Sequence, residues 1–108
     1  MNDARLLGRW RSDAMRTRKE LAARRDIPAR AKRTLAKLFG KLELRFTKSH
    51  CHSTLDGHTV SRQYAVLAKD DSSAATLSEG TISHIHFEKN HLWIHVGTGK
   101  FREYFRRV

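Results

Sequence analysis

Residues 81–107, TISHIHFEKNHLWIHVGTGKFREYFRR, decide the fold that the sequence predicts. Apolar and polar side chains alternate along this stretch with the period of two that is typical of half-buried β-strands. A two-residue turn at residues 89–90 would pair the large apolar side chains of its two flanking strands. The pairs are Phe87 with Leu92 and Ile85 with Ile94.

A second turn at Thr98-Gly99 would continue the same register into the last strand. It sets Val96 beside Phe101 and Leu92 beside Phe105, with Glu103 on the same face, while Trp93 meets Tyr104 and His95 meets Arg102 on the opposite face. A slip of one residue would move every side chain to the wrong face, so the agreement of two turns indicates an antiparallel meander.

The apolar face of this meander is expected to point inward. Exposing its side chains would cost roughly 1.5–3 kcal/mol each and leave a large apolar patch. The alternative is a polar interior that encloses Trp93 and Tyr104, in which case core and surface would exchange places.

The rest of the chain predicts more strands and one helical hairpin. A strand at residues 6–11 precedes a helix at 14–25, and a second helix starts at Pro28 and ends at Gly40. An Asp56-Gly57 hairpin would pair Ser53 with Val60 and Cys51 with Arg62, and a turn at 70–71 would pair Val66 with Ala75. Because residues 79–80 form either a turn or a bulge, seven or eight strands are expected.

The predicted fold is therefore mainly β, a small antiparallel up-and-down barrel with a helix-turn-helix inserted between strands 1 and 2. With 108 residues, the chain is expected to be one domain, 1–108, with a helical hairpin at about 14–39 and a β-meander at about 41–107. No apolar run is long enough for a transmembrane segment and no secretory signal is evident, so a cytoplasmic location is expected.

Positive charge is concentrated in the N-terminal part. The net charge is +11; residues 1–41 hold 13 basic and 4 acidic side chains, and residues 42–108 hold 9 and 7. Such a field attracts nucleic acid, anionic lipid or acidic protein without choosing among them.

Two short motifs and the order of elements carry a family resemblance. Gly8-x-Trp10 opens the first predicted strand, a helix-turn-helix follows, and the last strand of the meander holds Arg102-x-Tyr104. This arrangement resembles the calycin superfamily, and most closely its intracellular fatty-acid-binding branch. The resemblance implies a lipocalin-like barrel, a Trp10 that plugs one end under Arg106 or Arg107, and an Arg-x-Tyr pair that grips a ligand carboxylate from inside.

The register of the meander leaves two ligand sites open. It places Arg102 and Tyr104 opposite the apolar face, so their role requires a polar interior. With the apolar face inside, the enclosed polar groups include Arg62, Tyr64 and Glu103. Arg62 would then form a closed ion pair with Glu103 or Glu79, or else anchor an acidic ligand.

Catalytic and metal sites are not expected. His84, His86 and His95 would approach one another across one hairpin, but their neighbours are aromatic or basic side chains rather than the carboxylates that support metal ligands. Cys51, the single cysteine, is expected to be a buried inert thiol, and no paired acids or nucleophile motif indicate an enzyme. No metal or cofactor is therefore predicted.

Two functions follow. The first is a non-enzymatic binding protein for a small apolar or amphipathic acid, held by Arg62 and Tyr64, or by Arg102 and Tyr104. The alternative is a nucleic-acid or other polyanion-binding module that uses basic helical residues and an exposed aromatic face. Its candidate residues are Arg16, Arg18, Arg24, Arg25, Arg30, Arg33, Trp93 and Arg106. A domain that binds another protein remains a third hypothesis.

Overall fold

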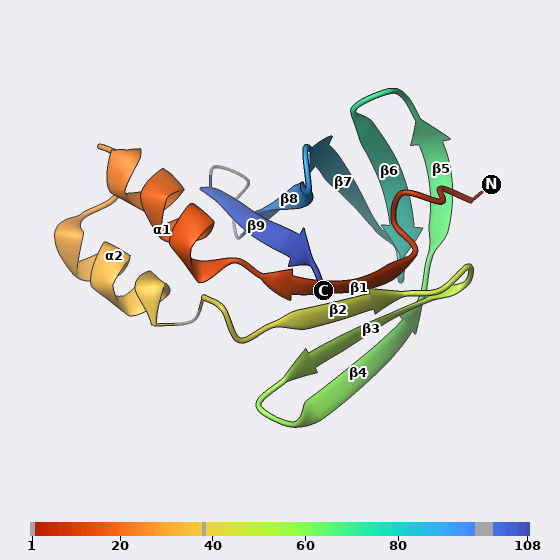
Figure 1. Ribbon diagram of the computed structural model, residues 1–108, viewed down its shortest axis with the longest axis horizontal. Helices are drawn as coiled ribbons and strands as arrows, with labels where there is room; N and C mark the ends of the chain where they lie inside the picture. The colour runs from red at the N-terminus through yellow and green to blue at the C-terminus, as the bar shows by residue number, and fades with distance from the viewer. Residues whose placement is uncertain (1, 38, 97–100) are drawn as a thin grey trace.

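The computed structural model describes residues 2–37, 39–96 and 101–108. These residues form a mainly β structure in which nine antiparallel strands curl into a nearly closed barrel and two helices connect the first two strands (Figure 1). The elements are β1 (Gly8–Ser12), α1 (Ala14–Ala23), α2 (Ala29–Ala36), β2 (Glu43–Phe46), β3 (His50–Leu55), β4 (His58–Gln63), β5 (Ala65–Lys69), β6 (Ser73–Ser78), β7 (Thr81–Glu88), β8 (His91–Val96) and β9 (Phe101–Arg107). Neither described helix is long and apolar enough to cross a membrane.

The strand order explains why the barrel is nearly, but not fully, closed. Neighbouring strands follow the order β4-β3-β2-β1-β9-β8-β7-β6-β5, so the first and last strands of the chain pair with each other. The two edge strands, β4 and β5, are consecutive in the chain and do not form a ladder with each other. We call the opening beside them the seam.

The predicted register of the meander is confirmed. Phe87 pairs with Leu92 and Ile85 with Ile94 across β7 and β8, and Trp93 pairs with Tyr104 across β8 and β9. The predicted turn at Thr98-Gly99 and the Val96 side chain lie outside the described residues. The Asp56-Gly57 hairpin is also confirmed, with Cys51 opposite Arg62.

The predicted number of strands is wrong because one expected strand divides at Tyr64 into β4 and β5. Residues 79–80 form a reversal between β6 and β7, with φ of 49° at Glu79 and 77° at Gly80. The nine strands of the described residues therefore replace the seven or eight expected.

The predicted pairing of Val66 with Ala75 is also wrong. Val66 pairs with Thr76, and the register shifts again between Val66 and Ala68. One Asp70 carboxylate oxygen accepts hydrogen bonds from the backbone N–H groups of Ser72 and Ser73, at 2.9 and 2.8 Å. This side chain stabilises a wider turn than the two residues expected, and the bulge takes up the difference.

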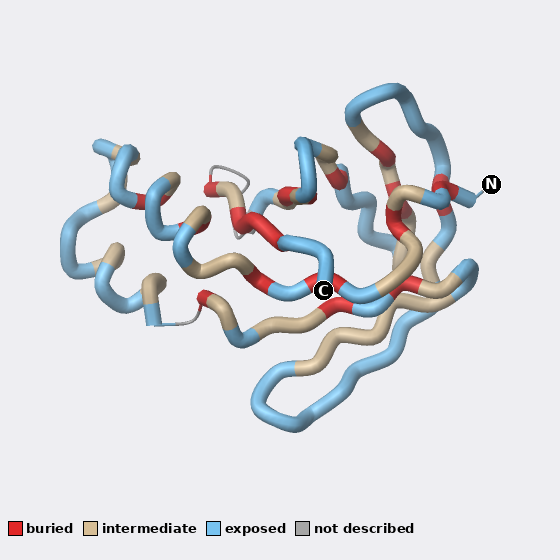
Figure 2. Tube along the Cα trace, in the orientation of Figure 1, coloured by how far each residue is buried: buried red, intermediate tan, exposed pale blue. Residues whose placement is uncertain are grey.

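The apolar face of the meander points into the barrel, as predicted. Ile85, Leu92 and Phe105 are buried there, with at most 5% of their surface exposed. Figure 2 shows buried positions along β1, β8 and β9 and exposed positions along the whole of β4. The core therefore draws on β1, β2 and β5 to β9, and the exposed edge strand β4 lies outside it.

The predicted plug at one end of the barrel is confirmed. Trp10 is buried, its indole N–H donates to the Leu6 carbonyl at 2.8 Å, and the Arg107 guanidinium lies 4.2 Å over its ring. Gly8 allows this close approach: its φ is 119°, and a Cβ placed there would lie 2.7 Å from Arg107 Nη1.

The helical hairpin lies against the other end of the strands (Figure 1). The Asp13 carboxylate caps α1, and the Thr17 hydroxyl accepts a hydrogen bond from the Tyr104 backbone N–H at 2.9 Å. Leu21, Phe39 and Phe101 form a second apolar cluster, with the two phenyl rings stacked 5.4 Å apart. Helix α1 thus covers β9 beyond the point where β1 ends at Ser12. The helix ends at Ala23, two residues earlier than predicted.

Candidate functional site

A cavity of about 180 Å³ lies inside the barrel beside the seam. It is lined by inner-face side chains of β2, β3, β4, β6, β7 and β8 together with Tyr64, which links β4 to β5. We call it the interior cavity. The lining residues are Leu44, Phe46, Cys51, Ser53, Arg62, Tyr64, Thr76, Ser78, Ser83, Ile85, Leu92 and Ile94.

Arg62 is the charged side chain in this lining. Its Nη1 donates to Glu79 Oε2 at 2.8 Å, and the two side chains are 55% and 62% exposed. The predicted alternative in which Glu79 is the partner of Arg62 is therefore the one found. Because both groups reach solvent, Arg62 lies at the mouth of the cavity and is not enclosed within it.

The mouth opens along β4, whose six residues are all exposed. Val60 and Leu55, which point toward the inner face, are 49% and 45% exposed because no strand pairs with β4 on its outer edge. The barrel wall is therefore incomplete where Arg62 meets Glu79.

Tyr64 and Cys51 supply further polar groups to the cavity lining. The Tyr64 hydroxyl donates to the Thr47 carbonyl at 2.6 Å, and burial raises its pKa. Burial also raises the pKa of Cys51, against a smaller opposing effect of a hydrogen bond with Ser53. A thiol with a raised pKa holds little thiolate near neutral pH, as expected of an unreactive cysteine.

Glu103 is buried, as predicted, but it does not line the interior cavity. The Ser12 hydroxyl donates to Glu103 Oε2 at 2.8 Å and accepts from the Gly40 backbone N–H at 3.0 Å. Burial raises the pKa of Glu103, and the Ser12 hydrogen bond partly opposes this. The Ser12 hydroxyl therefore joins β1 to Glu103 on β9 and to Gly40, which follows α2.

The predicted exposed aromatic face is wrong. Trp93 is 8% exposed and Tyr104 1% exposed, although both lie outside the barrel. His86 stacks on the Trp93 indole at 3.9 Å, and the Arg102 guanidinium lies 4.0 Å over the same ring. The Arg16 guanidinium lies 4.0 Å over Tyr104. Neighbouring side chains therefore occupy the ring faces that bases would need.

The same geometry bears on the ligand-binding prediction for the Arg-x-Tyr pair. Arg102 and Tyr104 do not line the interior cavity, because β9 turns its even-numbered residues outward. Of the two pairs predicted to meet a carboxylate, Arg62 and Tyr64 are the pair found at a cavity.

The basic helical residues are spread around the hairpin. Four of the predicted polyanion contacts are exposed: Arg18 on α1, Arg25 between the helices, and Arg30 and Arg33 on α2. Arg24 is paired with Asp26 at 2.6 Å, and Arg16 lies 3.9 Å from Glu20 and 3.8 Å from Glu88. Arg106 is exposed on β9. Trp93, the aromatic side chain predicted to act with these cations, is covered.

The histidines do not form a metal site within the described residues, where no three His, Cys, Asp or Glu side chains gather suitably. His86 and His95 approach each other, with ring centroids 6.2 Å apart. Burial lowers the pKa of His86, and its histidine and arginine neighbours lower it further. His86 therefore packs as a neutral ring against Trp93.

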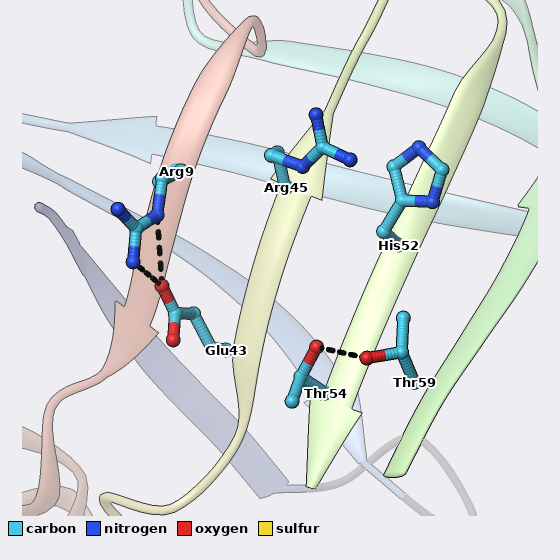
Figure 3. Close-up of a pocket in the computed structure, with 6 residues that line it drawn as sticks. All are labelled: Arg9, Glu43, Arg45, His52, Thr54 and Thr59. Atoms are coloured by element: carbon cyan, nitrogen blue, oxygen red, sulfur yellow. Dashed lines mark hydrogen bonds and ion pairs between the residues drawn. The ribbon is translucent and has the colours of Figure 1, made fainter. Parts of the chain in front are cut away.

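A second hollow, which the sequence did not predict, lies on the outside of the barrel. It is a groove of about 270 Å³, which we call the outer groove (Figure 3). Its lining residues are Arg9, Glu43, Arg45, His52, Thr54 and Thr59. The alternation along residues 43–46 puts Glu43 and Arg45 on one side of a strand, but it does not show which residues they meet across strands.

Compared with protein-family models, with curated proteins and with solved structures, the chain gave no match. The class that the fold defines is a nearly closed antiparallel barrel with a helical hairpin between its first two strands. Three features of this barrel bear on the function of the protein: the interior cavity, the exposed cations and the outer groove.

Proposed function

We propose that the chain is a non-enzymatic, lipocalin-like binding protein for a small apolar acid, in line with its resemblance to the calycins. The observation that carries the proposal is an apolar cavity with one cationic side chain, Arg62, at its mouth. The apolar lining would hold the body of the ligand. The Arg62 guanidinium would release the Glu79 carboxylate and donate two hydrogen bonds to the carboxylate of the ligand instead.

The volume of the cavity limits the size of the ligand. A cavity of about 150 Å³ holds benzene, whereas pockets for drug-sized ligands measure roughly 300–1,000 Å³. At about 180 Å³, the interior cavity suits a single ring or a short chain. A long fatty acid would have to extend out through the seam.

The expected affinity is modest. Burying a ring stabilises the complex by about 1.5–3 kcal/mol, as for a phenylalanine side chain, and a charge-assisted hydrogen bond adds about 1.5 kcal/mol. Together these give a Kd on the order of 1 mM.

Benzoate and benzamide test the proposal because they share a shape and differ in charge. NMR titration should show saturable benzoate binding at least several-fold tighter than benzamide binding, and Arg62→Met should remove this preference. Arg30→Gln serves as the control, because it removes an exposed cation from α2, away from the cavity. Equal affinity for the two ligands, or no saturable binding, would contradict the proposal.

A second candidate function is polyanion binding by the exposed cations of the helices and Arg106. It is favoured by the net charge of +11 and by the four exposed arginines of the helical hairpin. Since Trp93 is covered, such binding would be electrostatic, without base stacking. Log affinity for a single-stranded oligonucleotide should then fall with log salt by about 0.7 for each phosphate contacted. Affinity that does not change with salt would rule this function out.

A further inference from the structure

The outer groove brings side chains of the first four strands together on the face opposite the interior cavity. Figure 3 shows Arg9 on β1 and Arg45 on β2 beside His52 on β3, with Thr59 on β4 at the far side. All six lining side chains are polar or charged. The groove is therefore lined by hydrogen-bonding side chains, and its lining includes no apolar side chain to hold a lipid tail or a base.

Its basic side chains form one cross-strand row. Arg9 is the register partner of Arg45, and Arg45 is the register partner of His52. Like charges placed directly opposite each other on neighbouring strands destabilise a sheet. A surface that served stability would pair Arg45 with an acid, yet basic side chains flank it on both sides.

The acid nearest to this row is already engaged. Glu43 accepts a hydrogen bond from Arg9 Nε at 2.9 Å. Within the described part of the chain, Arg45 has no hydrogen bond or ion pair to another side chain, and Figure 3 shows its guanidinium pointing toward His52. Arg45 thus holds an exposed, uncompensated charge in the middle of the groove.

The neighbouring row holds two further cations and one acid. Arg106 on β9 is the register partner of Arg11 on β1, and both are exposed; Arg11 in turn lies opposite Glu43 on β2. Threonine hydroxyls border the groove on the other side, where Thr54 and Thr59 lie 2.9 Å apart. An anion in the groove would therefore meet guanidinium groups on one side and hydroxyl groups on the other.

We propose that the outer groove binds the terminal phosphate of a small soluble phosphate monoester. A planar carboxylate is satisfied by one guanidinium fork, whereas a tetrahedral phosphate accepts hydrogen bonds from several directions and carries up to two negative charges. The donors here come from four separate strands, β1 to β4. The dianion would also relieve the repulsion between Arg9 and Arg45.

This site is distinct from the interior cavity, because β1, β2 and β3 present alternate residues to opposite faces of the sheet. Leu44 and Phe46 line the interior cavity, while Arg45, between them in the chain, lines the outer groove. Loss of phosphate binding through Arg45 would leave benzoate binding unaffected, so failure of one proposal can be told from failure of the other.

Glycerol phosphate and dimethyl phosphate are the probes for the test. The first is a monoester that can carry two charges, the second a diester with one, and glycerol serves as the uncharged control. By NMR titration of the full chain at low salt, glycerol phosphate should bind more tightly than dimethyl phosphate and shift the amides of β1 to β4. Arg45→Gln should weaken it about tenfold, the loss of one charge-assisted hydrogen bond.

Arg30→Gln is the matched variant, since it removes the same charge from an exposed position on α2. It should change phosphate affinity less than twofold, and Arg45→Gln should leave the melting temperature unchanged or raise it. Equal losses in both variants would overturn the site in favour of diffuse attraction. Binding of an oligothymidylate without binding of glycerol phosphate would overturn it in favour of a polyanion surface.

Discussion

Glu79→Gln should increase the affinity of the interior cavity for an acidic ligand. In the free protein, Arg62 Nη1 and Glu79 Oε2 form an ion pair at 2.8 Å at the mouth of the cavity. A ligand carboxylate must displace it before it can bind Arg62. The glutamine side chain keeps the shape of the glutamate but competes less well for the guanidinium.

The magnitude follows from the exposure of the pair. Both side chains are more than half exposed, so solvent screens their attraction. Exposed ion pairs of this kind contribute about 0.2–1 kcal/mol, so releasing Arg62 should tighten benzoate binding by roughly 1.5- to 5-fold. Arg62→Met should weaken it by roughly 10- to 15-fold, the lower end of the range for a charge-assisted hydrogen bond.

The assay is a double-mutant cycle measured by NMR titration with benzoate, with benzamide as the neutral reference. Glu79→Gln should act through Arg62, so in the Arg62→Met background it should change benzoate affinity less than twofold. Unfolding in urea should be nearly the same for all four proteins, because an exposed ion pair adds little stability. If Glu79→Gln tightened benzoate binding equally in both backgrounds, the competition between Glu79 and the ligand would be disproved.

Three further predictions concern stability, each measured as the free energy of unfolding in urea. Burial raises the pKa of Glu103 above its ordinary 4.5, so the folded state loses stability as pH rises through that raised value; Glu103→Gln should stabilise the protein near pH 7 but not near pH 4. Burial acts to raise the pKa of Asp13, but hydrogen bonds, including the one with His91, bring this pKa below its ordinary 3.8. Asp13→Asn keeps a capping side chain and should destabilise the protein by about 0.5–1 kcal/mol near pH 6, and this difference should vanish as pH falls through the lowered pKa. Gly8→Ala should destabilise it by about 1–3 kcal/mol at every pH through its positive φ and the clash with Arg107, and an unchanged stability would refute that steric argument.

Local turn chemistry explains which parts of the fold could be predicted from the sequence. Two-residue turns at Asp56-Gly57 and Lys89-Asn90 determine the register of their hairpins, because a period of two leaves a single arrangement that buries the apolar side chains. At Asp70, by contrast, a side-chain carboxylate binds two backbone N–H groups and widens the turn. Alternation alone cannot reveal that difference.

Alternation along the strands also predicted the candidate sites only in part. Alternation placed Arg62 and Tyr64 on the inner face, where they line the interior cavity, and Trp93 on the outer face, where it does lie. It could not show that Arg102 and His86 cover the Trp93 ring, since a strand pattern gives the direction of a side chain and not the neighbours that pack over it. Arg45 was missed because its significance depends on Arg9, a partner 36 positions away along the chain that comes beside it when β1 pairs with β2.

The central claim is that the barrel interior admits a small acid past Arg62. Methyl chemical shifts, measured during a benzoate titration, test it directly because isoleucines lie on both faces of the barrel: Ile85 and Ile94 line the interior cavity, and Ile82 is 58% exposed on the outer face. Benzoate in the interior cavity should give saturable shifts at Ile85 and Ile94 with none at Ile82. Shifts at Ile82 without shifts at the two inner isoleucines would show that benzoate binds outside the barrel, and the claim would be wrong.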